Sequence, residues 1–145
     1  MLSKLCTKPQ TGNIVRFLFL LLFSAVLFEA CQKDLEGVDK RDKIVASWKC
    51  QETGNLSGNA SYWVDVTKAS DDSTKVFLDN FYQLGSGVKT FAYLNGLSLI
   101  IPKQTTDKFQ ISGTGTISSD YKSIRWTYST YEGSETDNVT STYTK

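Results

Sequence analysis

The chain has 145 residues, of which 40% are hydrophobic and 21% are charged, and its formal net charge is +1. This length and composition predict a single globular domain and exclude a largely disordered chain. The small net charge, without a run of basic residues, predicts that nucleic acid is not a partner.

The first thirty residues have the pattern of a signal peptide. Lys4, Lys8 and Arg16 supply positive charge, and residues 17–28 follow without any charged side chain. This apolar stretch is shorter than the roughly 20 residues that a membrane-spanning helix needs. We therefore expect residues 1–30 to be a signal peptide rather than a transmembrane anchor.

A single cysteine, Cys31, follows Ala30 at the end of this stretch. A cysteine after a small residue at this place resembles the lipobox of bacterial lipoproteins. The resemblance implies that Cys31 becomes the mature N-terminus and carries acyl chains such as palmitate. Two or three acyl chains hold a protein on a membrane much longer than one chain does. The alternative is an ordinary signal peptide followed by a chance cysteine.

Residues 31–42 are expected to form the lipidated N-terminus and a flexible tether. The sequence QKDLEGVDKRD is polar and alternates in charge, so it can bury too little apolar surface to fold alone. The segment CQKDLE also resembles the surface-export signal of Bacteroidetes lipoproteins. That resemblance implies a lipid-anchored outer-membrane protein exposed at the cell surface, whereas a plain solvated spacer would leave the protein facing the periplasm.

Residues 43–145 are expected to form an all-β domain, because short stretches rich in Val, Ile, Thr and aromatic residues alternate with turn residues. The expected strands are 44–52, 60–67, 74–81, 87–94, 97–101, 108–117, 122–130 and 138–144. Short loops favour antiparallel neighbours, and about eight such strands can close into a single up-and-down barrel or split into two sheets. A closed barrel is favoured, because closure leaves no exposed edge. Asn95-Gly96 is expected to form a type I′ turn between two of these strands.

The alternation of side chains along each strand predicts one continuous interior. The residues expected to face inward are Tyr62, Val64, Val66, Val76, Leu78, Leu97, Leu99, Ile101, Phe109, Ile111, Ile117, Ile124, Trp126, Tyr128, Val139 and Tyr143. Cys50 is expected to be a buried or half-buried strand residue without a disulfide partner. Gly113 and Gly115 are expected where the barrel curves tightly or another segment approaches closely.

Several segments of this domain resemble the small lipocalin-like, calycin-type lipoproteins of Bacteroidetes. They are IVASWKCQET, VFLDNFYQLG, LSLIIPKQ, ISGTGTIS and VTSTYTK. The resemblance spans nearly the whole mature chain and implies a lipocalin-like barrel and a lipid-anchored location, without an assigned activity. Ala46-Ser47-Trp48 stands where lipocalins have Gly-x-Trp. Trp48 is therefore predicted to plug one end of the barrel, with Arg125 as a cation–π partner.

The sequence offers little for catalysis. It contains no histidine, which removes the usual general base near neutral pH and most zinc sites. The paired acids Asp71 and Asp72 lie in a polar turn, where such pairs are more often solvated than catalytic. We therefore expect no enzymatic activity, no cofactor and no metal site. Ser73, in the sequence Asp-Ser-Thr, resembles the O-glycosylation acceptor of Bacteroidetes.

Four large aromatic residues are expected on the outer wall of the barrel: Trp63, Phe77, Phe91 and Tyr93. Aromatic rings gathered on a solvent-facing surface often mark a binding site, and flat rings suit sugars or a partner protein. The alternative is that the N-terminal segment, or a helix over residues 35–45, covers these rings.

The expected function is that of a lipid-anchored binding or accessory module of the outer membrane or cell surface, with a glycan or a protein as its ligand. The alternative is a lipocalin-like carrier that holds a small apolar ligand inside the barrel. The bulk of the inward aromatic residues opposes a carrier, since it tends to fill an eight-stranded interior. Inhibition of a secreted hydrolase is a third hypothesis, which the sequence does not separate from the first.

Overall fold

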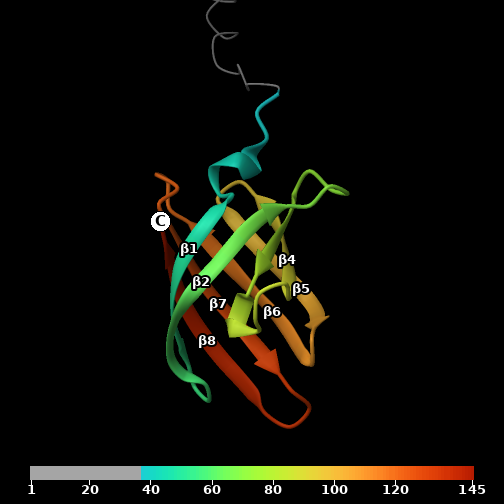
Figure 1. The fold of residues 1–145 in the computed structure, drawn as a ribbon, viewed down its shortest axis with the longest axis vertical. Coiled ribbons are helices and arrows are strands. Elements are labelled where there is room, and N and C mark those ends of the chain that lie inside the picture. The colour runs from blue at the N-terminus through green and yellow to red at the C-terminus, as the bar shows by residue number, and fades with distance from the viewer. Residues whose placement is uncertain (1–36) are drawn as a thin grey trace, which may run out of the picture. The chain divides into compact units, whose positions relative to one another are not determined.

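The structure is a computed structural model that describes residues 37–145. Eight antiparallel strands follow one another in chain order around a closed barrel (Figure 1). The elements are η2 (Lys40–Lys43), β1 (Ala46–Gly54), β2 (Gly58–Lys68), β3 (Lys75–Asp79), η3 (Phe81–Gln83), β4 (Lys89–Asn95), β5 (Ser98–Thr106), β6 (Phe109–Ile117), β7 (Ser123–Tyr131) and β8 (Thr136–Thr144). The predicted all-β, up-and-down barrel is confirmed. The predicted signal peptide and Cys31 lie outside the described residues.

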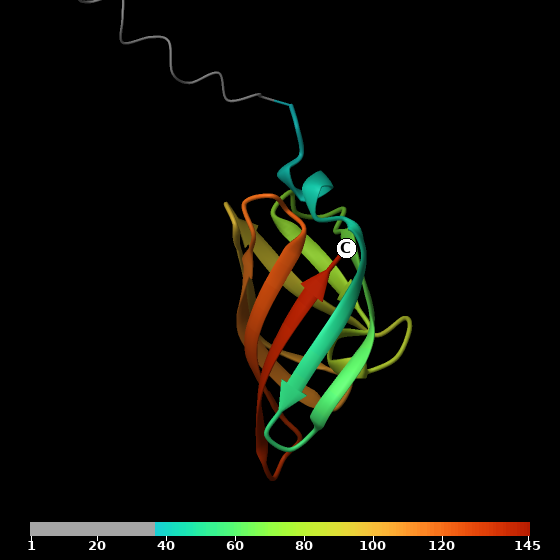
Figure 2. The same ribbon diagram turned by 90° about the vertical axis from the view of Figure 1, so that its left-hand side faces the viewer.

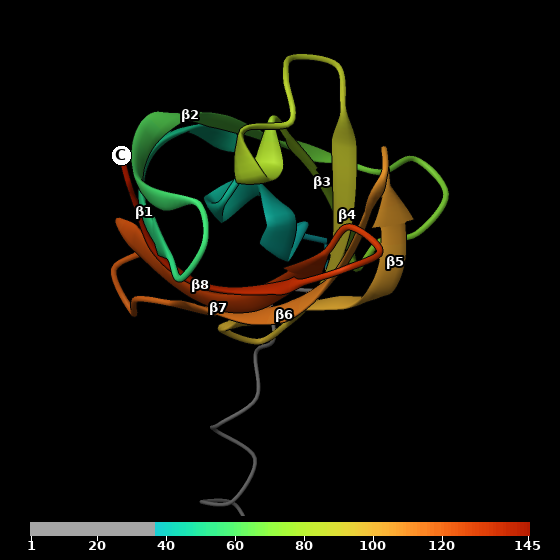
Figure 3. The ribbon, with the colours of Figure 1, turned by 90° about the horizontal axis from the view of Figure 1, so that it is seen from below.

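The barrel closes because β1 pairs with both β2 and β8. Lys49, for example, lies opposite Trp63 on one side and opposite Thr144 on the other. Figure 3 shows the resulting ring of strands from below. We call the end that carries η2 the upper end, and the end that carries the β7–β8 turn, at residues 132–135, the lower end (Figure 1). None of the helices in the described part of the chain is both long and apolar enough to span a membrane.

The interior is filled by the side chains that the alternation predicts, with two differences. All the predicted inward residues are buried except Leu97, which is 38% exposed, and Phe109, which is half-buried against the core. The largest fully buried side chains include Trp48, Trp126 and Tyr143. Aromatic side chains therefore occupy much of the barrel interior.

Leu97 is exposed because the turn between β4 and β5 lies one residue later than predicted. Asn95 pairs with Ser98, which leaves Gly96 and Leu97 as the two turn residues. Only Gly96 has a positive φ, of 60°. A positive φ at the first central residue alone is the pattern of a type II′ turn with glycine first, rather than of the predicted type I′ turn.

Strand β5 continues well beyond its predicted end at Ile101. Its register against β6 shifts between Ile101 and Gln104, so Pro102 lies in an irregularity, where its missing N–H disturbs no regular ladder. The Gln104 side chain then pairs with the backbone of Phe91. Its Nε2 donates to the Phe91 carbonyl at 2.7 Å, and the Phe91 N–H donates to its Oε1 at 3.1 Å. A side-chain amide thus replaces strand pairing between β4 and β5 at this point.

The segment after β3 differs from the predicted strand 74–81. The strand ends at Asp79, and the chain turns through η3, where Asn80, Tyr82 and Gln83 all have positive φ. This backbone inserts Phe81 into the barrel, where its ring lies 4.6 Å from that of Tyr128. Packing of Phe81 offsets a backbone conformation that residues other than glycine rarely adopt.

Residues 39–42, predicted to belong to the flexible tether, are part of the folded unit Asp39–Lys145. The cause is Arg41, whose side chain is buried at the upper end. Its Nη1 donates to the carbonyls of Ala69, Asp72 and Lys75 at 2.7 to 2.9 Å, and its Nε and Nη2 bond Asp39. The Arg41 side chain also holds the pKa of Asp39 well below its ordinary value. One arginine therefore fixes the segment on the β2–β3 turn.

The two glycines of β6 lie where aromatic side chains of β7 pack against the strand. A Cβ added at Gly115 would lie 2.8 Å from the Trp126 ring, and one at Gly113 would lie 2.2 Å from the Tyr128 Cβ. The predicted close approach is confirmed, and it comes from the neighbouring strand.

Candidate functional site

The four aromatic side chains predicted on the outside all lie on the outer wall, but in two separate places. Phe77 and Phe91 lie opposite each other on β3 and β4, and the Tyr93 ring lies 5.7 Å from the Phe91 ring. Trp63 lies on β2, four residues from Thr67, the residue that pairs with Phe77. At 3.3 Å per residue this is a separation of about 13 Å along the strand. The structure therefore does not join Trp63 to the other three rings.

Lysine side chains cover the rings on β3 and β4. Lys75 Nζ lies 5.4 Å from the centroid of Phe77 and 5.0 Å from that of Phe91, and Lys89 Nζ lies 5.7 Å from that of Phe77. Phe77 and Phe91 are consequently half-buried. The cover is thus not the helix over residues 35–45, since η2 contains only Lys40–Lys43. Rings already engaged by cations offer less surface to a ligand.

Among residues 37–145, Trp63 is the most exposed of the large aromatic side chains, at 59%. Its strand borders an open groove of about 670 Å³ on the outer wall of β2, β1, β8 and β7. Figure 2 looks onto the part of this wall where β2, β1 and β8 lie side by side. We call it the outer groove and define it by its outward-facing residues: Gln51, Thr53, Asn59, Ser61, Arg125, Thr140 and Thr142.

The strand register arranges these residues in parallel rows across the wall. One row runs Ser61, Gln51, Thr142 and Arg125 from β2 to β7. The next row towards the lower end runs Asn59, Thr53, Thr140 and Thr127, and the row towards the upper end runs Trp63, Lys49, Thr144 and Ser123. The middle row thus ends at the Arg125 guanidinium on β7, and the row above it begins at the Trp63 ring on β2.

Most polar side chains of the outer groove are free to bind a ligand. Thr53 donates to Asn59 Oδ1 at 2.8 Å. Within residues 37–145, no hydrogen bond or ion pair engages the side chains of Gln51, Arg125 or Thr142. Their amide, guanidinium and hydroxyl groups face solvent and retain their full capacity to bond.

Arg125 does not contact Trp48, so the predicted cation–π pair is wrong. Arg125 points outward on β7, whereas Trp48 is fully buried on the inner side of β1. The cation over the Trp48 ring is Lys145, whose Nζ lies 4.5 Å from the ring centroid. Trp48 Nε1 donates to the Ile44 carbonyl at 2.9 Å, which ties the ring to the segment after η2.

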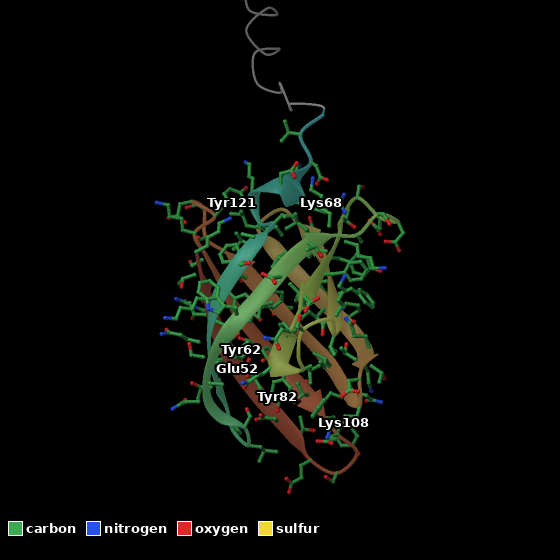
Figure 4. The ribbon with its side chains drawn as sticks, viewed as in Figure 1. Glu52, Tyr62, Lys68, Tyr82, Lys108 and Tyr121 are labelled. Atoms are coloured by element: carbon green, nitrogen blue, oxygen red, sulfur yellow. The ribbon has the colours of Figure 1, made fainter. Side chains whose placement is uncertain are left out.

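A buried carboxylate, Glu52, lies inside the barrel behind the outer groove. Tyr62 donates to its Oε2 at 2.5 Å, and Tyr128 donates to the same oxygen. Figure 4 shows Glu52 beside Tyr62, with Tyr82 below them towards the lower end. Burial raises the pKa of Glu52, the two tyrosine hydrogen bonds oppose this rise, and the charge of Asp137 adds to it. Glu52 is therefore buried in the core and does not serve as a solvent-exposed base.

A second, smaller pocket of about 280 Å³ opens at the lower end, lined by Tyr82, Phe109 and Asp137 among others. Asp137 accepts hydrogen bonds from the N–H groups of Leu56 and Ser57 and from the Tyr82 hydroxyl, at 2.8 to 3.1 Å. Burial tends to raise the pKa of Asp137, but the bonds from Ser57 and Leu56 outweigh it and lower the pKa. Asp137 therefore joins the β1–β2 turn to η3 as an ionised group.

Neither a protein-family model nor a curated protein matches this chain. Among solved structures, a redesigned β-barrel is similar, with a TM-score of 0.51 and 12% sequence identity. The alignment covers 72% of this chain and 92% of the redesigned barrel. At this identity the similarity supports the small closed barrel alone and carries no function.

Ser73, the predicted O-glycosylation site, is exposed in the β2–β3 turn. Beside it, Asp72 Oδ1 accepts hydrogen bonds from the Thr74 N–H and hydroxyl, both at 2.7 Å. The turn presents Ser73 to solvent, and its modification stays a prediction. In the described part of the chain, no three Asp, Glu or Cys side chains gather as metal ligands would.

The sequence pattern did not single out Glu52 or the groove residues other than Arg125, which was predicted to pair with Trp48 instead. The outward positions Gln51, Arg125 and Thr142 follow from the same alternation that predicts the core, but their proximity depends on the pairing of β1 with β8 and of β8 with β7. Glu52 shares a strand face with Trp48 and Cys50, which was a usable signal for its burial.

Proposed function

We propose that this protein is a lipid-anchored, lipocalin-like binding module of the outer membrane or cell surface, and that it binds a glycan in the outer groove. The proposed anchor is Cys31, from its resemblance to a lipobox. The proposal is one of binding rather than catalysis, since the sequence contains no histidine and, of the described residues that line the groove, the one carboxylate, Glu52, points inward.

The observation that carries the proposal is an exposed tryptophan beside a groove of free polar side chains. Sugar rings present apolar faces that pack on aromatic rings, and hydroxyl edges that bond amide and hydroxyl groups. Trp63 supplies the ring, and Gln51 and Ser61 supply such groups in the adjacent row. An aromatic ring next to polar side chains therefore suits both the apolar face and the hydroxyl edge of a sugar ring.

A binding experiment with a matched pair of variants tests this proposal. The mature chain, residues 31–145 with Cys31→Ser, is screened against an array of neutral and acidic oligosaccharides. Trp63→Ala should weaken binding about tenfold or more, taking as a guide the roughly 1–3 kcal/mol that stacking of a nucleic-acid base on an aromatic side chain contributes. Its thermal stability should stay unchanged, because the Trp63 ring is mostly in solvent.

The control is Tyr93→Ala, which removes an aromatic ring from the lysine-covered surface of β3 and β4. This variant should bind as the parent protein does. If no oligosaccharide binds, or if Trp63→Ala binds as tightly as the parent, the outer groove is not a glycan site.

A carrier of a small apolar ligand is the second candidate, favoured by the pocket at the lower end with its Tyr82 and Phe109 rings. The bulk of Trp48, Trp126 and Phe81 opposes it, because these side chains occupy the interior. Titration with an apolar fluorescent probe separates the two functions. Saturable one-to-one binding would support a carrier, whereas the filled interior predicts no saturation.

A further inference from the structure

We propose that the sugar recognised by the outer groove is acidic, and that Arg125 binds its anionic group. This inference rests on the proposed function and specifies its ligand class. It follows from the sign and the placement of the charges on this wall.

Arg125 lies in the same row as the polar groups of the groove. It pairs across the strands with Thr142, which in turn pairs with Gln51. Within residues 37–145 no carboxylate lies within ion-pair distance of Arg125, although Arg41, by contrast, is bonded to Asp39. The guanidinium of Arg125 is therefore an exposed cation with five free donors.

The second cation of this wall is Lys49, which lies directly opposite Trp63. No ion pair engages Lys49 among the described residues either. Lys49 thus lies two residues before Gln51 on β1, and Arg125 lies two strands away from Gln51 in the same row.

In the described part of the chain, the carboxylates near this wall form no ion pair with either of these two cations. Glu52 points into the core, where Tyr62 and Tyr128 hold it. Asp65 lies on the outer wall beyond Trp63, and Ser47 donates a hydrogen bond to it. In the two rows that hold Trp63 and Arg125, the charged side chains are Lys49 and Arg125, both positive, and an anionic ligand complements them.

A guanidinium group favours planar or branched anions, because its N–H groups can donate two parallel bonds to a carboxylate or sulfate. A uronic acid or a sulfated sugar carries such an anion on a ring with an apolar face. Trp63 and Arg125 are about 15 Å apart across three strand spacings, so the ring on Trp63 and the anion on Arg125 belong to different sugar units of one oligosaccharide.

The test compares oligosaccharides that differ only in charge, measured by calorimetric titration with the mature chain carrying Cys31→Ser. The probes are oligogalacturonate, its methyl ester, chondroitin and chondroitin sulfate, with polyglutamate as an acidic peptide. Arg125→Gln should weaken binding of the best acidic oligosaccharide about tenfold, the size expected for one lost charge-assisted hydrogen bond. Arg125→Lys keeps the positive charge but loses the two parallel N–H donors of the guanidinium group. Its affinity should therefore lie between that of the parent protein and that of Arg125→Gln.

Lys103→Gln is the matched control, since it removes one exposed positive charge from the outer wall of β5. Lys103→Gln should change the affinity less than twofold. Raising the salt concentration to about 1 M, where the screening length is about 3 Å, should weaken the binding of the acidic probes alone. A uronate preference over sulfate, or the reverse, identifies the anion.

The outcomes separate the two proposals. If oligosaccharides bind and Trp63→Ala weakens them, but neutral probes bind as well as acidic ones and Arg125→Gln has no effect, only the acidic-sugar inference fails. If polyglutamate binds as tightly as the acidic oligosaccharides, the ligand is an acidic chain rather than a sugar, and both proposals fail.

Discussion

Glu52 is the residue at which burial and charge conflict most directly. It is 5% exposed, and its carboxylate accepts hydrogen bonds from two tyrosine hydroxyls. Because burial raises its pKa in the folded state, the protonated form is favoured there. The contribution of Glu52 to stability is therefore complete at acidic pH, and it is lost as the pH rises through the raised folded-state pKa.

Glu52→Gln should remove this loss, because glutamine stays neutral and its carbonyl oxygen still accepts the bonds from Tyr62 and Tyr128. The two proteins should have similar melting temperatures at pH 4, and the variant should become increasingly more stable up to pH 8. Thermal melts across this range measure the difference. Comparing the pair cancels the opposite trend of carboxylates with lowered pKa, such as Asp39 and Asp137. A difference that shrinks with rising pH would show that Glu52 is ionised in the fold.

At the scale of the element, β6 is shaped by the aromatic rings of its neighbour. Gly115→Ala would place a Cβ 2.8 Å from the Trp126 ring, which cannot move far inside a filled core. Overpacking of this kind should lower the free energy of unfolding by about 1–3 kcal/mol. Thr114→Ala, at the adjacent outward position, should change it by about 0.5 kcal/mol or less. Urea unfolding of both variants tests the contact, and equal losses would contradict it.

The strands themselves were predictable because the alternation of apolar side chains is a local signal. What the sequence could not provide were features that depend on distant partners. Arg41 is ordered by carbonyls about thirty residues away, and Phe81 leaves its strand to fill space next to Tyr128. The same distinction holds for the site. The exposure of Trp63 follows from alternation, whereas the row that joins Gln51 to Arg125 exists only once the barrel closes.

At the scale of the whole molecule, the proposed anchor and the barrel are separable. Cys31 precedes the folded unit, which begins at Asp39 and has its own core. Cys31→Ser should therefore release the protein from the membrane fraction without changing the melting temperature of the barrel. Fractionation after a high-salt wash measures the release. A protein that stays in the membrane fraction would show that something other than lipid on Cys31 holds it there.

The contact between Lys145 and the segment around η2 has a further consequence for the connectivity of the chain. Lys145 Nζ donates to the Lys43 carbonyl at 2.7 Å, so the first and last segments of the barrel meet at the upper end. Chains with neighbouring ends tolerate circular permutation. Joining residue 145 to residue 39 by a short linker, and opening the exposed turn at 132–135, should retain every strand pairing. A lipid-bearing cysteine at the new N-terminus would then anchor the barrel by its lower end, so that η2 points away from the membrane.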